Sequence, residues 1–364
     1  MHNTRKDGLI KQLKQAEMES FLITDPVNIR YICGFTGTSG FLLVTQKRST
    51  LLTDFRYIEQ AESETKGIKD LQVIKHDYPV SKTIQEIASG LNTKTIYFEK
   101  KHLTYDGYEK LKAKLDDIDF IPHEGMVESL RMQKDESEIN KIEAACEISD
   151  AAFSHIISYI RPGVKERDLS IELEYYMKKS GAEGISFDII VASGERSSLP
   201  HGVASDREIK PGDLLKMDFG AVYNGYCSDI TRTLMLATQG EREKIKTQEK
   251  IYEIVLKAQT EALKGIEPGM TVKDADNLAR NVIIEAGYGK YFGHGLGHGI
   301  GLKVHESPTL SINSNDVLKE NMVFTVEPGI YLPDKGGVRI EDTVQLKPEG
   351  CTALTKSTKK LIII

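Results

Sequence analysis

The sequence predicts an N-terminal α/β domain followed by an α+β domain that is built from two related halves. In residues 1–127, short apolar runs alternate with amphipathic segments, a pattern typical of α/β domains. In residues 128–364, an ordered series of turn, helix and acidic positions recurs at a constant offset of 106 residues. The length of 364 residues fits two or three domains of about 150 residues each.

The N-terminal domain is expected to contain strands connected by helices. Runs rich in Leu, Ile, Val and Phe predict strands at 21–24, 41–44, 51–53, 71–74 and 95–98. Amphipathic periodicity predicts helices at 7–17, 80–90 and 103–115. Gly34, Gly37 and Gly40 do not match a dinucleotide-binding fingerprint, so they are interpreted as turn glycines.

A domain boundary is expected near 125–132. One long helix over 134–160 is expected after it. Apolar residues recur along it at mostly helical spacing. The sequence Arg161-Pro162-Gly163 is a stop signal and is expected to end this helix.

An internal repeat organises the second domain. Pro162-Gly163 and Gly181 recur as Pro268-Gly269 and Gly287, so each copy has a Pro-Gly turn, a helix and a glycine stop. Further along the two copies, acidic residues also correspond. Asp218 matches Glu327, and Asp229 corresponds loosely to Glu341. Each half therefore contributes two carboxylates.

The first carboxylate pair lies on a predicted hairpin with Asn224-Gly225 at its turn, a strong hairpin signal. Counting back from the turn places Asp218 opposite Thr231 and puts Asp229 on the same face, about 7–8 Å away at the backbone. Both side chains could then reach one metal cluster. The alternative, a pair of solvated acids, is disfavoured because both strands are rich in apolar residues.

The second pair, Glu327 and Glu341, brackets a predicted turn at 334–337. Loop length does not fix the register of this hairpin, and an exposed acidic hairpin is more plausible here than in the first half. Pro328 follows Glu327 directly, and proline favours a bend in a strand.

Three histidines lie in a glycine-rich segment at 292–305, namely His294, His298 and His305. Glycine allows a backbone to approach a ligand closely, although a flexible loop with incidental histidines would show the same pattern. His201 lies between Pro200 and Gly202. The remaining histidines are interpreted as surface or packing residues: His2, His76, His102, His123 and His155.

Four carboxylates together with imidazoles suit divalent ions such as Mn²⁺, Co²⁺, Fe²⁺ and Zn²⁺. Four negative ligands would balance two divalent cations. A water molecule bridging such ions loses a proton easily and becomes a nucleophile near neutral pH. Without ions the clustered carboxylates would repel one another.

Composition excludes several classes of protein. The net charge of −6, from 48 basic and 54 acidic residues, disfavours nucleic-acid binding by bulk charge. No apolar run approaches the ~18 residues of a membrane helix, and no secretory signal is expected at the N-terminus. The four cysteines lie far apart, which excludes a zinc knuckle and indicates reduced thiols. We expect a cytoplasmic protein that binds neither nucleic acid nor membrane.

Five segments together resemble the motifs of the pita-bread metallopeptidases. They are MDFG at 217–220, YCSDITRT at 226–233, GHGLGHGIG at 293–301, TVEPG at 325–329 and VRIED at 338–342. Residues 28–40 resemble the creatinase/prolidase N-terminal domain. The resemblance spans nearly the whole chain and is greatest to the proline-specific branch, Xaa-Pro aminopeptidase and Xaa-Pro dipeptidase (prolidase).

The resemblance implies a role for each motif residue. The implied metal ligands are Asp218, Asp229, His298, Glu327 and Glu341. Asp229 and Glu341 would bridge two ions. These ions would be Mn²⁺, with Co²⁺, Zn²⁺ or Fe²⁺ as alternatives. Glu327 would also be the general base. His201 and His305 would hydrogen-bond the substrate, His294 would line the proline pocket, and Arg339 would lie near the carbonyl or carboxylate end of the substrate. A homodimer is also implied.

The function that follows is a proline-specific exopeptidase. It would hydrolyse the Xaa-Pro bond next to a free N-terminus, with a hydroxide that bridges the two ions as nucleophile. The alternatives are a methionine aminopeptidase, which shares the ligands, and a non-catalytic binding module on the same fold. The N-terminal domain and the intact ligand set disfavour these two. The sequence leaves open whether the substrates are Xaa-Pro dipeptides or longer peptides with proline at position 2.

Overall fold

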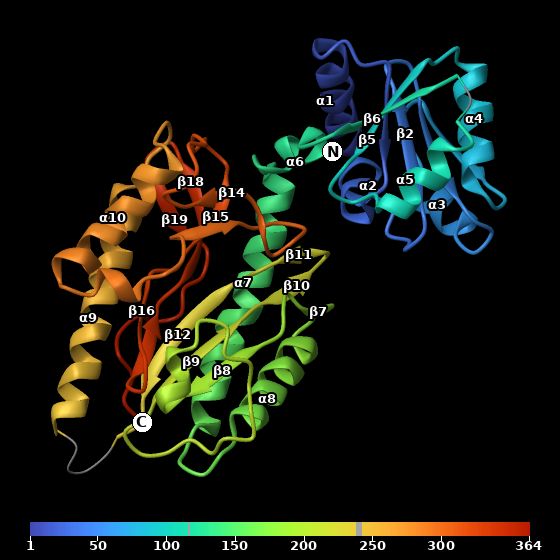
Figure 1. Ribbon diagram of the computed structural model, residues 1–364. Coiled ribbons are helices and arrows are strands. Elements are labelled where there is room, and N and C mark those ends of the chain that lie inside the picture. The colour runs from blue at the N-terminus through green and yellow to red at the C-terminus, as the bar shows by residue number, and fades with distance from the viewer. Residues whose placement is uncertain (116, 238–241) are drawn as a thin grey trace. The chain divides into compact units, whose positions relative to one another are not determined.

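A computed structural model describes residues 1–115, 117–237 and 242–364. It divides into two compact units, Met1–Arg131 and Met132–Ile364, each of which is described by itself. The two units are coloured blue to green and green to red in Figure 1. The boundary expected after residue 127 falls inside helix α6.

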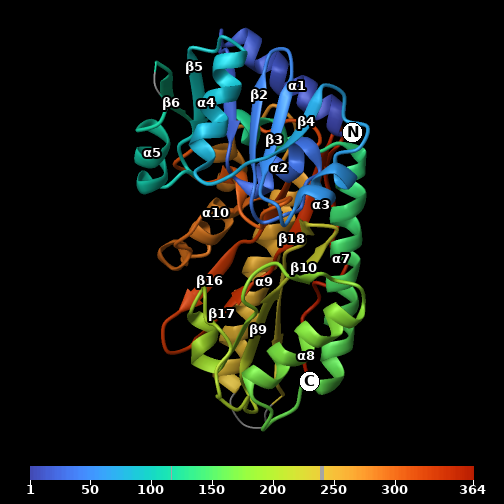
Figure 2. The same cartoon turned by 90° about the vertical axis from the view of Figure 1, so that its right-hand side faces the viewer.

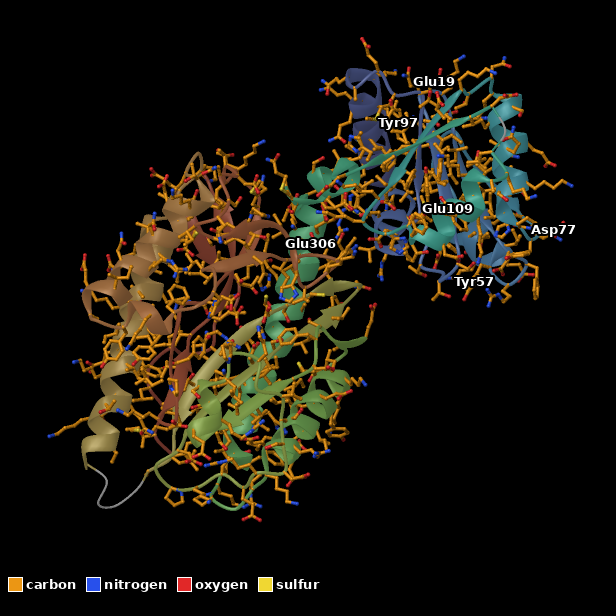
Figure 3. The ribbon with its side chains drawn as sticks, in the orientation of Figure 1. Glu19, Tyr57, Asp77, Tyr97, Glu109 and Glu306 are labelled. Carbon is orange, nitrogen blue, oxygen red and sulfur yellow. The ribbon has the colours of Figure 1, made fainter. Side chains whose placement is uncertain are left out.

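Unit 1 contains a six-stranded sheet in the order β4-β3-β2-β1-β5-β6. Its strands are β1 (Ser20–Ile23), β2 (Phe41–Thr45), β3 (Ser49–Thr53), β4 (Leu71–Lys75), β5 (Thr95–Glu99) and β6 (Asp119–His123). Its helices are α1 (His2–Gln15), α2 (Pro26–Cys33), α3 (Ile58–Glu64), α4 (Val80–Gly90), α5 (Tyr105–Lys112) and α6 (Met126–Arg131). Only β2 runs antiparallel to its neighbours. In Figure 3, Glu19 therefore marks the amino ends of the parallel strands, and Tyr57 and Asp77 mark their carboxyl ends.

The five strands and three helices predicted for this unit are confirmed, whereas α2, α3, α6 and β6 were not predicted. Helix α2 is short, and capping residues at both termini set its bounds. The Asp25 side chain accepts a hydrogen bond from the Val27 amide, Pro26 occupies the first turn, and Gly34 ends the helix with a left-handed φ of 78°. These end signals are present in the sequence, but eight residues give too little periodicity for a helix prediction.

Unit 2 contains two pairs of helices, α7 (Glu136–Ile156) with α8 (Glu166–Lys179) and α9 (Arg242–Gly265) with α10 (Val272–Glu285). Helices α8 and α10 each have 14 residues and begin and end at an offset of 106, which confirms the repeat. The helix predicted over 134–160 begins after Asp135, whose side chain forms a capping box with Glu138. It ends at Ile156, where a short 3₁₀ helix, η1 (Ile157–Tyr159), continues the chain.

Within its described residues, the strands of unit 2 form four sheets. Their orders are β11-β10-β7, β12-β9-β8, β14-β13-β15-β18-β19 and β16-β17. The strands of the first half are β7 (Gly184–Ile185), β8 (Ile190–Ser193), β9 (Leu214–Phe219), β10 (Ala221–Tyr223), β11 (Tyr226–Cys227) and β12 (Ile230–Met235). Those of the second half are β13 (Gly297–Gly299), β14 (Glu306–Leu310), β15 (Val323–Val326), β16 (Gly329–Leu332), β17 (Gly336–Arg339), β18 (Asp342–Lys347) and β19 (Gly350–Ala353). Two further 3₁₀ helices are η2 (Gly194–Ser198) and η3 (Gly289–Tyr291).

Two long hairpins determine where the acidic residues lie. In the first, Tyr223 pairs with Tyr226 and Asp218 with Thr231, which confirms the predicted register. In the second, Val326 pairs with Asp342 and Gly329 with Arg339. This continuous register places Glu327 directly opposite Glu341. The hairpins meet where the Glu341 amide donates to the Thr231 carbonyl at 3.2 Å and Thr343 Oγ1 donates to the Asp229 carbonyl at 2.8 Å.

Two hydrophobic cores hold the hairpins from opposite sides. Helices α7 and α8 contribute to the core of β8, β9 and β12, whereas α9 and α10 contribute to the core of β15, β16 and β18. Figures 1 and 2 show the strands between these two helix pairs. Both hairpins are therefore covered. Asp218, Asp229 and Glu341 are buried, and Glu327 is partly buried. Among the described helices, none is both long and apolar enough to cross a membrane.

Gly220, between Asp218 and the first hairpin turn, has no room for a side chain. A Cβ at this position would lie 1.9 Å from the Ser228 carbonyl oxygen. We therefore expect Gly220→Ala to lower the free energy of unfolding by about 3 kcal/mol, since overpacking forces the backbone to shift. Chemical denaturation would measure the loss.

Gly184 in the adjacent strand β7 provides a matched control, because a Cβ there meets no atom within 4 Å. Gly184→Ala should change the unfolding free energy by less than about 1 kcal/mol. Equal effects of the two substitutions would contradict this account of the hairpin.

Candidate metal centre

The first hairpin supplies two buried carboxylates. Asp218 lies near the end of β9, and Asp229 lies just before β12. Arg339 donates from Nη2 to Asp218 Oδ2. The Oδ1 atoms of Asp218 and Asp229 are buried and have no hydrogen-bond partner within the described residues. Buried carboxylate oxygens are normally hydrogen-bonded, so two orphaned ones side by side on a hairpin indicate a missing electrophilic partner.

The second hairpin supplies Glu327, directly after β15, and Glu341, directly before β18. Glu341 Oε2 accepts a hydrogen bond from Thr231 Oγ1 at 2.5 Å, so the two hairpins also meet through this ligand candidate. Glu327 Oε1 accepts from Thr325 Oγ1 at 3.3 Å. Each glutamate is thus oriented by a threonine hydroxyl and keeps other lone pairs for a further partner.

His298 presents a lone pair to these carboxylates. Its Nδ1 lies 3.1 Å from the Gly299 carbonyl oxygen, which can only accept, so Nδ1 carries the proton. Burial lowers the pKa of His298, so the ring is neutral near pH 7 and Nε2 is an acceptor. Nε2 lies 3.6 Å from Asp229 Oδ2 and 3.5 Å from Glu327 Oε1. An acceptor that faces two carboxylate oxygens is unfavourable unless a metal cation or a proton lies between them.

Glycine lets the strand that carries His298 approach its neighbours. A Cβ at Gly297 would lie 2.0 Å from the Thr325 carbonyl oxygen, and one at Gly299 would lie 2.3 Å from that of Ser307. The glycine-rich segment is therefore well packed around His298 in strand β13, and the flexible-loop alternative does not describe it.

The electrostatics of the metal-free cluster are unfavourable. Burial, with repulsion from Glu341, Asp218 and Glu327, raises the pKa of Asp229 well above its usual value. The pKa of Glu341 is raised in the same way, by burial and by repulsion from Glu327 and Asp218. Burial raises the pKa of Glu327 to about 7, although Arg339 opposes this effect. Protons compete for the ligand atoms when no metal cation is bound.

The donor set fits divalent ions. Asp229, His298 and Glu341 each offer one ligand atom, and these atoms lie within 4.8 Å of one another. Glu327 borders the same group, because its Oε1 lies 3.5 Å from His298 Nε2, and the charge of Asp218 also raises the pKa of Asp229. Carboxylate oxygens and one neutral imidazole nitrogen suit ions such as Mn²⁺, Co²⁺, Fe²⁺ and Zn²⁺. The structure thus brings together all five predicted ligand candidates.

Beside this cluster, His294, Tyr331 and Arg339 form a hydrogen-bonded chain. His294 Nδ1 lies 2.8 Å from the Gly295 carbonyl oxygen and Nε2 lies 2.9 Å from Tyr331 Oη. Burial and the charge of Arg339 lower the pKa of His294 to about 4, so the ring is neutral and Nε2 accepts from Tyr331. Arg339 Nη1 donates to Tyr331 Oη at 3.0 Å. The directions of all three bonds are therefore fixed.

Arg339 is largely engaged by the protein itself. Besides Asp218 and Tyr331, it donates from Nε to Thr231 Oγ1 at 2.9 Å and from Nη1 to the Pro200 carbonyl at 3.0 Å. Burial opposes its charge, but Tyr331 and the surrounding carboxylates hold the pKa of Arg339 well above its usual value. A guanidinium has five N–H groups. Because most of them donate to protein acceptors here, few remain to hydrogen-bond a substrate.

His305 and His201 lie at the edge of the cluster. The His305 ring packs against the His298 ring with centroids 4.3 Å apart, and burial lowers the pKa of His305. His201 is exposed, and it lies close enough to His294 and His305 to influence the pKa of both rings. Four histidines therefore surround the carboxylates, one as a ligand candidate and three around it.

Several site residues were not predicted from the sequence. Thr231 was identified only as the partner of Asp218 in the hairpin, and that register could have shown that its hydroxyl faces the cluster. Tyr331 and Lys216 carry no motif, because a tyrosine or lysine in an apolar strand has no spacing that signals a contact. Burial, with the charge of Arg339, lowers the pKa of Lys216 to about 6.

Comparison with known proteins identifies the family. Residues 140–348 match metallopeptidase family M24, and residues 5–133 match the creatinase/prolidase N-terminal domain. An Xaa-Pro dipeptidase of Pyrococcus furiosus is 44% identical over 363 residues, which cover 98% of this chain and 99% of the relative.

Solved structures agree with this match over both units. The Xaa-Pro dipeptidase from Bacillus anthracis is similar with a TM-score of 0.95 and 45% identity, and all of both chains is covered. The X-Pro aminopeptidase from Thermotoga maritima has a TM-score of 0.88 and 40% identity, with 99% of each chain covered. The predicted architecture, a creatinase-type domain before a pita-bread domain, is thereby confirmed. The chain belongs to metallopeptidase family M24.

Proposed function

We propose that this chain is a metal-dependent exopeptidase that hydrolyses the bond between a first residue with a free amino group and a following proline. The observation that carries the proposal is the cluster of four carboxylates and a neutral histidine, with two orphaned buried oxygens, on the hairpins of an M24 fold. The names of relatives support the preference for proline.

Asp218, Asp229, His298, Glu327 and Glu341 would hold two divalent ions, which the family implies. Asp229 and Glu341 would bridge them. When bound, such ions lower the pKa of a water molecule and polarise a peptide carbonyl. Mn²⁺ is the ion we propose, with Co²⁺, Zn²⁺ and Fe²⁺ as alternatives, because hard carboxylate oxygens predominate among the ligands.

Glu327 is proposed as the general base. Burial raises the pKa of Glu327 to about 7 in the metal-free cluster, and bound cations would lower it, so Glu327 would be ionised and able to accept a proton near neutral pH. A proline nitrogen has no N–H and must be protonated to leave as an amine. Glu327 could take a proton from water and deliver it to this nitrogen.

The surrounding side chains would bind and orient the peptide. His201 and His305 would hydrogen-bond the substrate and stabilise charge that develops on the scissile carbonyl. His294 would line the proline pocket, as the resemblance to the family implies, and its ring is held in place by Tyr331 and Gly295. Arg339 would contact the far end of the substrate only through N–H groups that do not donate to the protein.

Two further parts of the proposal concern context. A homodimer is implied by the resemblance to the family. A reducing compartment such as the cytoplasm is supported by four free cysteines, of which Cys33, Cys146 and Cys227 are buried. Methionine aminopeptidase activity is less well supported, because residues 5–133 match the N-terminal domain of creatinase and prolidase.

Metal removal should make stability depend on pH. The folded metal-free protein holds carboxyl groups with raised pKa values, so it binds more protons than the unfolded chain. Stability that is present at low pH is therefore lost as pH rises, between about pH 4 and pH 7. Metal binding needs the deprotonated ligands and should reverse this loss.

Thermal unfolding after treatment with a chelator, with and without added Mn²⁺, would measure this effect. The difference in Tm between the two forms should grow from pH 5 to pH 7.5, and chelation should abolish peptidase activity. A constant difference in Tm, or full activity in metal-free protein, would contradict the assignment of the ligands.

Single substitutions should separate the ligands from the substrate-binding histidines. Asp229→Ala removes a proposed bridge between ions, so it should reduce both metal content and activity, with activity falling more than about 100-fold. His305→Ala should keep the metal and lower kcat by about 100-fold, a typical loss for a group that stabilises transition-state charge. Metal analysis and steady-state kinetics on both variants check this. If His305→Ala loses its metal as completely as Asp229→Ala, the roles are wrong.

Substrate preference tests the exopeptidase itself. Xaa-Pro peptides should be cleaved, N-acetylation should abolish cleavage, and replacing proline with alanine should lower kcat/KM by about 10- to 200-fold. Comparing Met-Pro with Met-Ala peptides would also identify methionine aminopeptidase activity, which predicts no such loss. Adding a third residue after proline distinguishes a dipeptidase, which should reject it, from an aminopeptidase.

A further inference from the structure

A buried lysine in strand β9 reaches the turn that carries His201. The Lys216 side chain is 0% exposed. Its Nζ donates to the Leu199 carbonyl at 2.5 Å and to the Pro200 carbonyl at 3.2 Å, and it lies 5.1 Å from the centre of the Tyr331 ring. Both acceptors belong to the two residues that directly precede His201.

The geometry of β9 connects this lysine with the metal centre. Lys216 and Asp218 are two residues apart in one strand, so their side chains lie on the same face. Arg339 contacts Asp218 at one end of its guanidinium and the Pro200 carbonyl at another. Two buried basic side chains therefore donate to the Pro200 carbonyl, and one of them, Arg339, also contacts a metal-ligand candidate.

Other contacts hold the two ends of this turn: the Leu199 amide donates to the Arg196 carbonyl at 2.9 Å, Arg196 Nη2 donates to the Val203 carbonyl at 2.9 Å, and Val203 forms a β-bridge with Ile190. The side chain of Leu199 is 48% exposed and His201 is exposed, so the turn is not held by apolar burial. Within it, the Gly202 amide donates to the Leu199 carbonyl at 3.2 Å and the Val203 amide to the His201 carbonyl at 2.9 Å. These bonds shape the turn locally. The bonds from Lys216 and Arg339 are those that connect residues 199 and 200 to the hairpins.

The burial of Lys216 is costly, which makes a purely packing role unattractive. Taking an amine out of water is unfavourable unless its N–H groups find acceptors, and an apolar side chain would fill the same space without that cost. A protonated amine has three donors and a neutral amine has two, so the two carbonyl bonds can form in either state.

We infer that Lys216 is a positioning residue, which together with Arg339 holds the carbonyls of Leu199 and Pro200 and thereby fixes the His201 imidazole beside His294 and His305. The inference deepens the proposed function and rests on it, because the effect on turnover requires that His201 contacts the substrate. The effect on the turn itself does not require this.

The test begins with Lys216→Met, which keeps an unbranched apolar chain and removes the donors. Hydrogen–deuterium exchange is measured on peptides covering residues 199–203, in metal-free and Mn²⁺-loaded protein. We expect exchange at Gly202 and Val203 to accelerate by about tenfold or more, since loss of the anchoring bonds opens the turn locally. Lys216→Leu serves as a second apolar replacement and should give the same result.

Kinetics then test the connection to His201. Lys216→Met should lower kcat for an Xaa-Pro peptide by about tenfold, with KM and metal content little changed, as expected when a transition-state interaction is misaligned. In a His201→Ala background, Lys216→Met should cause no further loss, because the residue acts through His201.

Leu173→Ala is the control for a merely structural effect. Leu173 is buried in α8, in the core beneath β8 and β9. This variant should lower Tm, yet leave the exchange of residues 199–203 and kcat within about twofold of the parent.

Two results would overturn the inference. Unchanged exchange at 199–203 in both Lys216 variants would show that the lysine does not hold the turn, whatever the enzyme hydrolyses. Additive losses in the double variant with His201→Ala would show that Lys216 acts by another route. If instead the parent fails to cleave Xaa-Pro peptides while exchange accelerates in the Lys216 variants, the proposed function is wrong and the positioning of the turn stands.

Discussion

Mutual repulsion among four clustered carboxylates, three of them buried and one partly buried, is the constraint on which the second unit depends. Asp218, Asp229, Glu327 and Glu341 carry four negative charges when ionised. Arg339 hydrogen-bonds Asp218, and its Nε lies 4.0 Å from Glu327 Oε2. Burying such a group without compensation would cost several kcal/mol per charge. The raised pKa values of Asp229, Glu341 and Glu327 show that cost in the metal-free state. Two divalent ions would remove it, so metal binding and the stability of the hairpins are coupled.

The repeat explains how one chain brings these groups together. Each half provides a helix pair and a long hairpin with two acids, and the hairpins meet edge to edge through Thr231 and Thr343. Because each helix pair covers one hairpin, the site lies between two separate cores. Because both halves supply ligands to the metal centre, a displacement of either half would remove ligands from it. The hydroxyl of Thr231 illustrates this, since it comes from the first hairpin and contacts Glu341 and Arg339 of the second.

Much of this arrangement could be predicted from the sequence, for physical reasons that differ between elements. Asn224-Gly225 favours a two-residue turn, so counting from it gives the pairing of Asp218 with Thr231. The repeat is visible because helices α8 and α10 need the same turn and stop residues at the same spacing. By contrast, the three residues between β16 and β17 allow several registers, so the pairing of Glu327 with Glu341 was not predictable.

Other features depend on tertiary contacts that no local pattern encodes. Tyr331 orients His294 and Arg339 from a strand that reads only as apolar. Lys216 resembles a solvent-exposed lysine in the sequence, and only the packing around β9 buries it. Arg339 was expected at the substrate on the basis of resemblance, whereas most of its donors bind the protein. Side chains that position other side chains are thus the part of the site that sequence patterns show least.

The central claim is that two ions occupy the space between the hairpins. Anomalous diffraction from a crystal of the Mn²⁺-loaded protein tests it most directly, because the technique locates manganese independently of any assumed ligand. The account predicts two anomalous peaks among Asp218, Asp229, His298, Glu327 and Glu341, with Asp229 and Glu341 contacting both. A fully loaded crystal with no peak there, or with a single peak that Asp229 and Glu341 do not share, would contradict it.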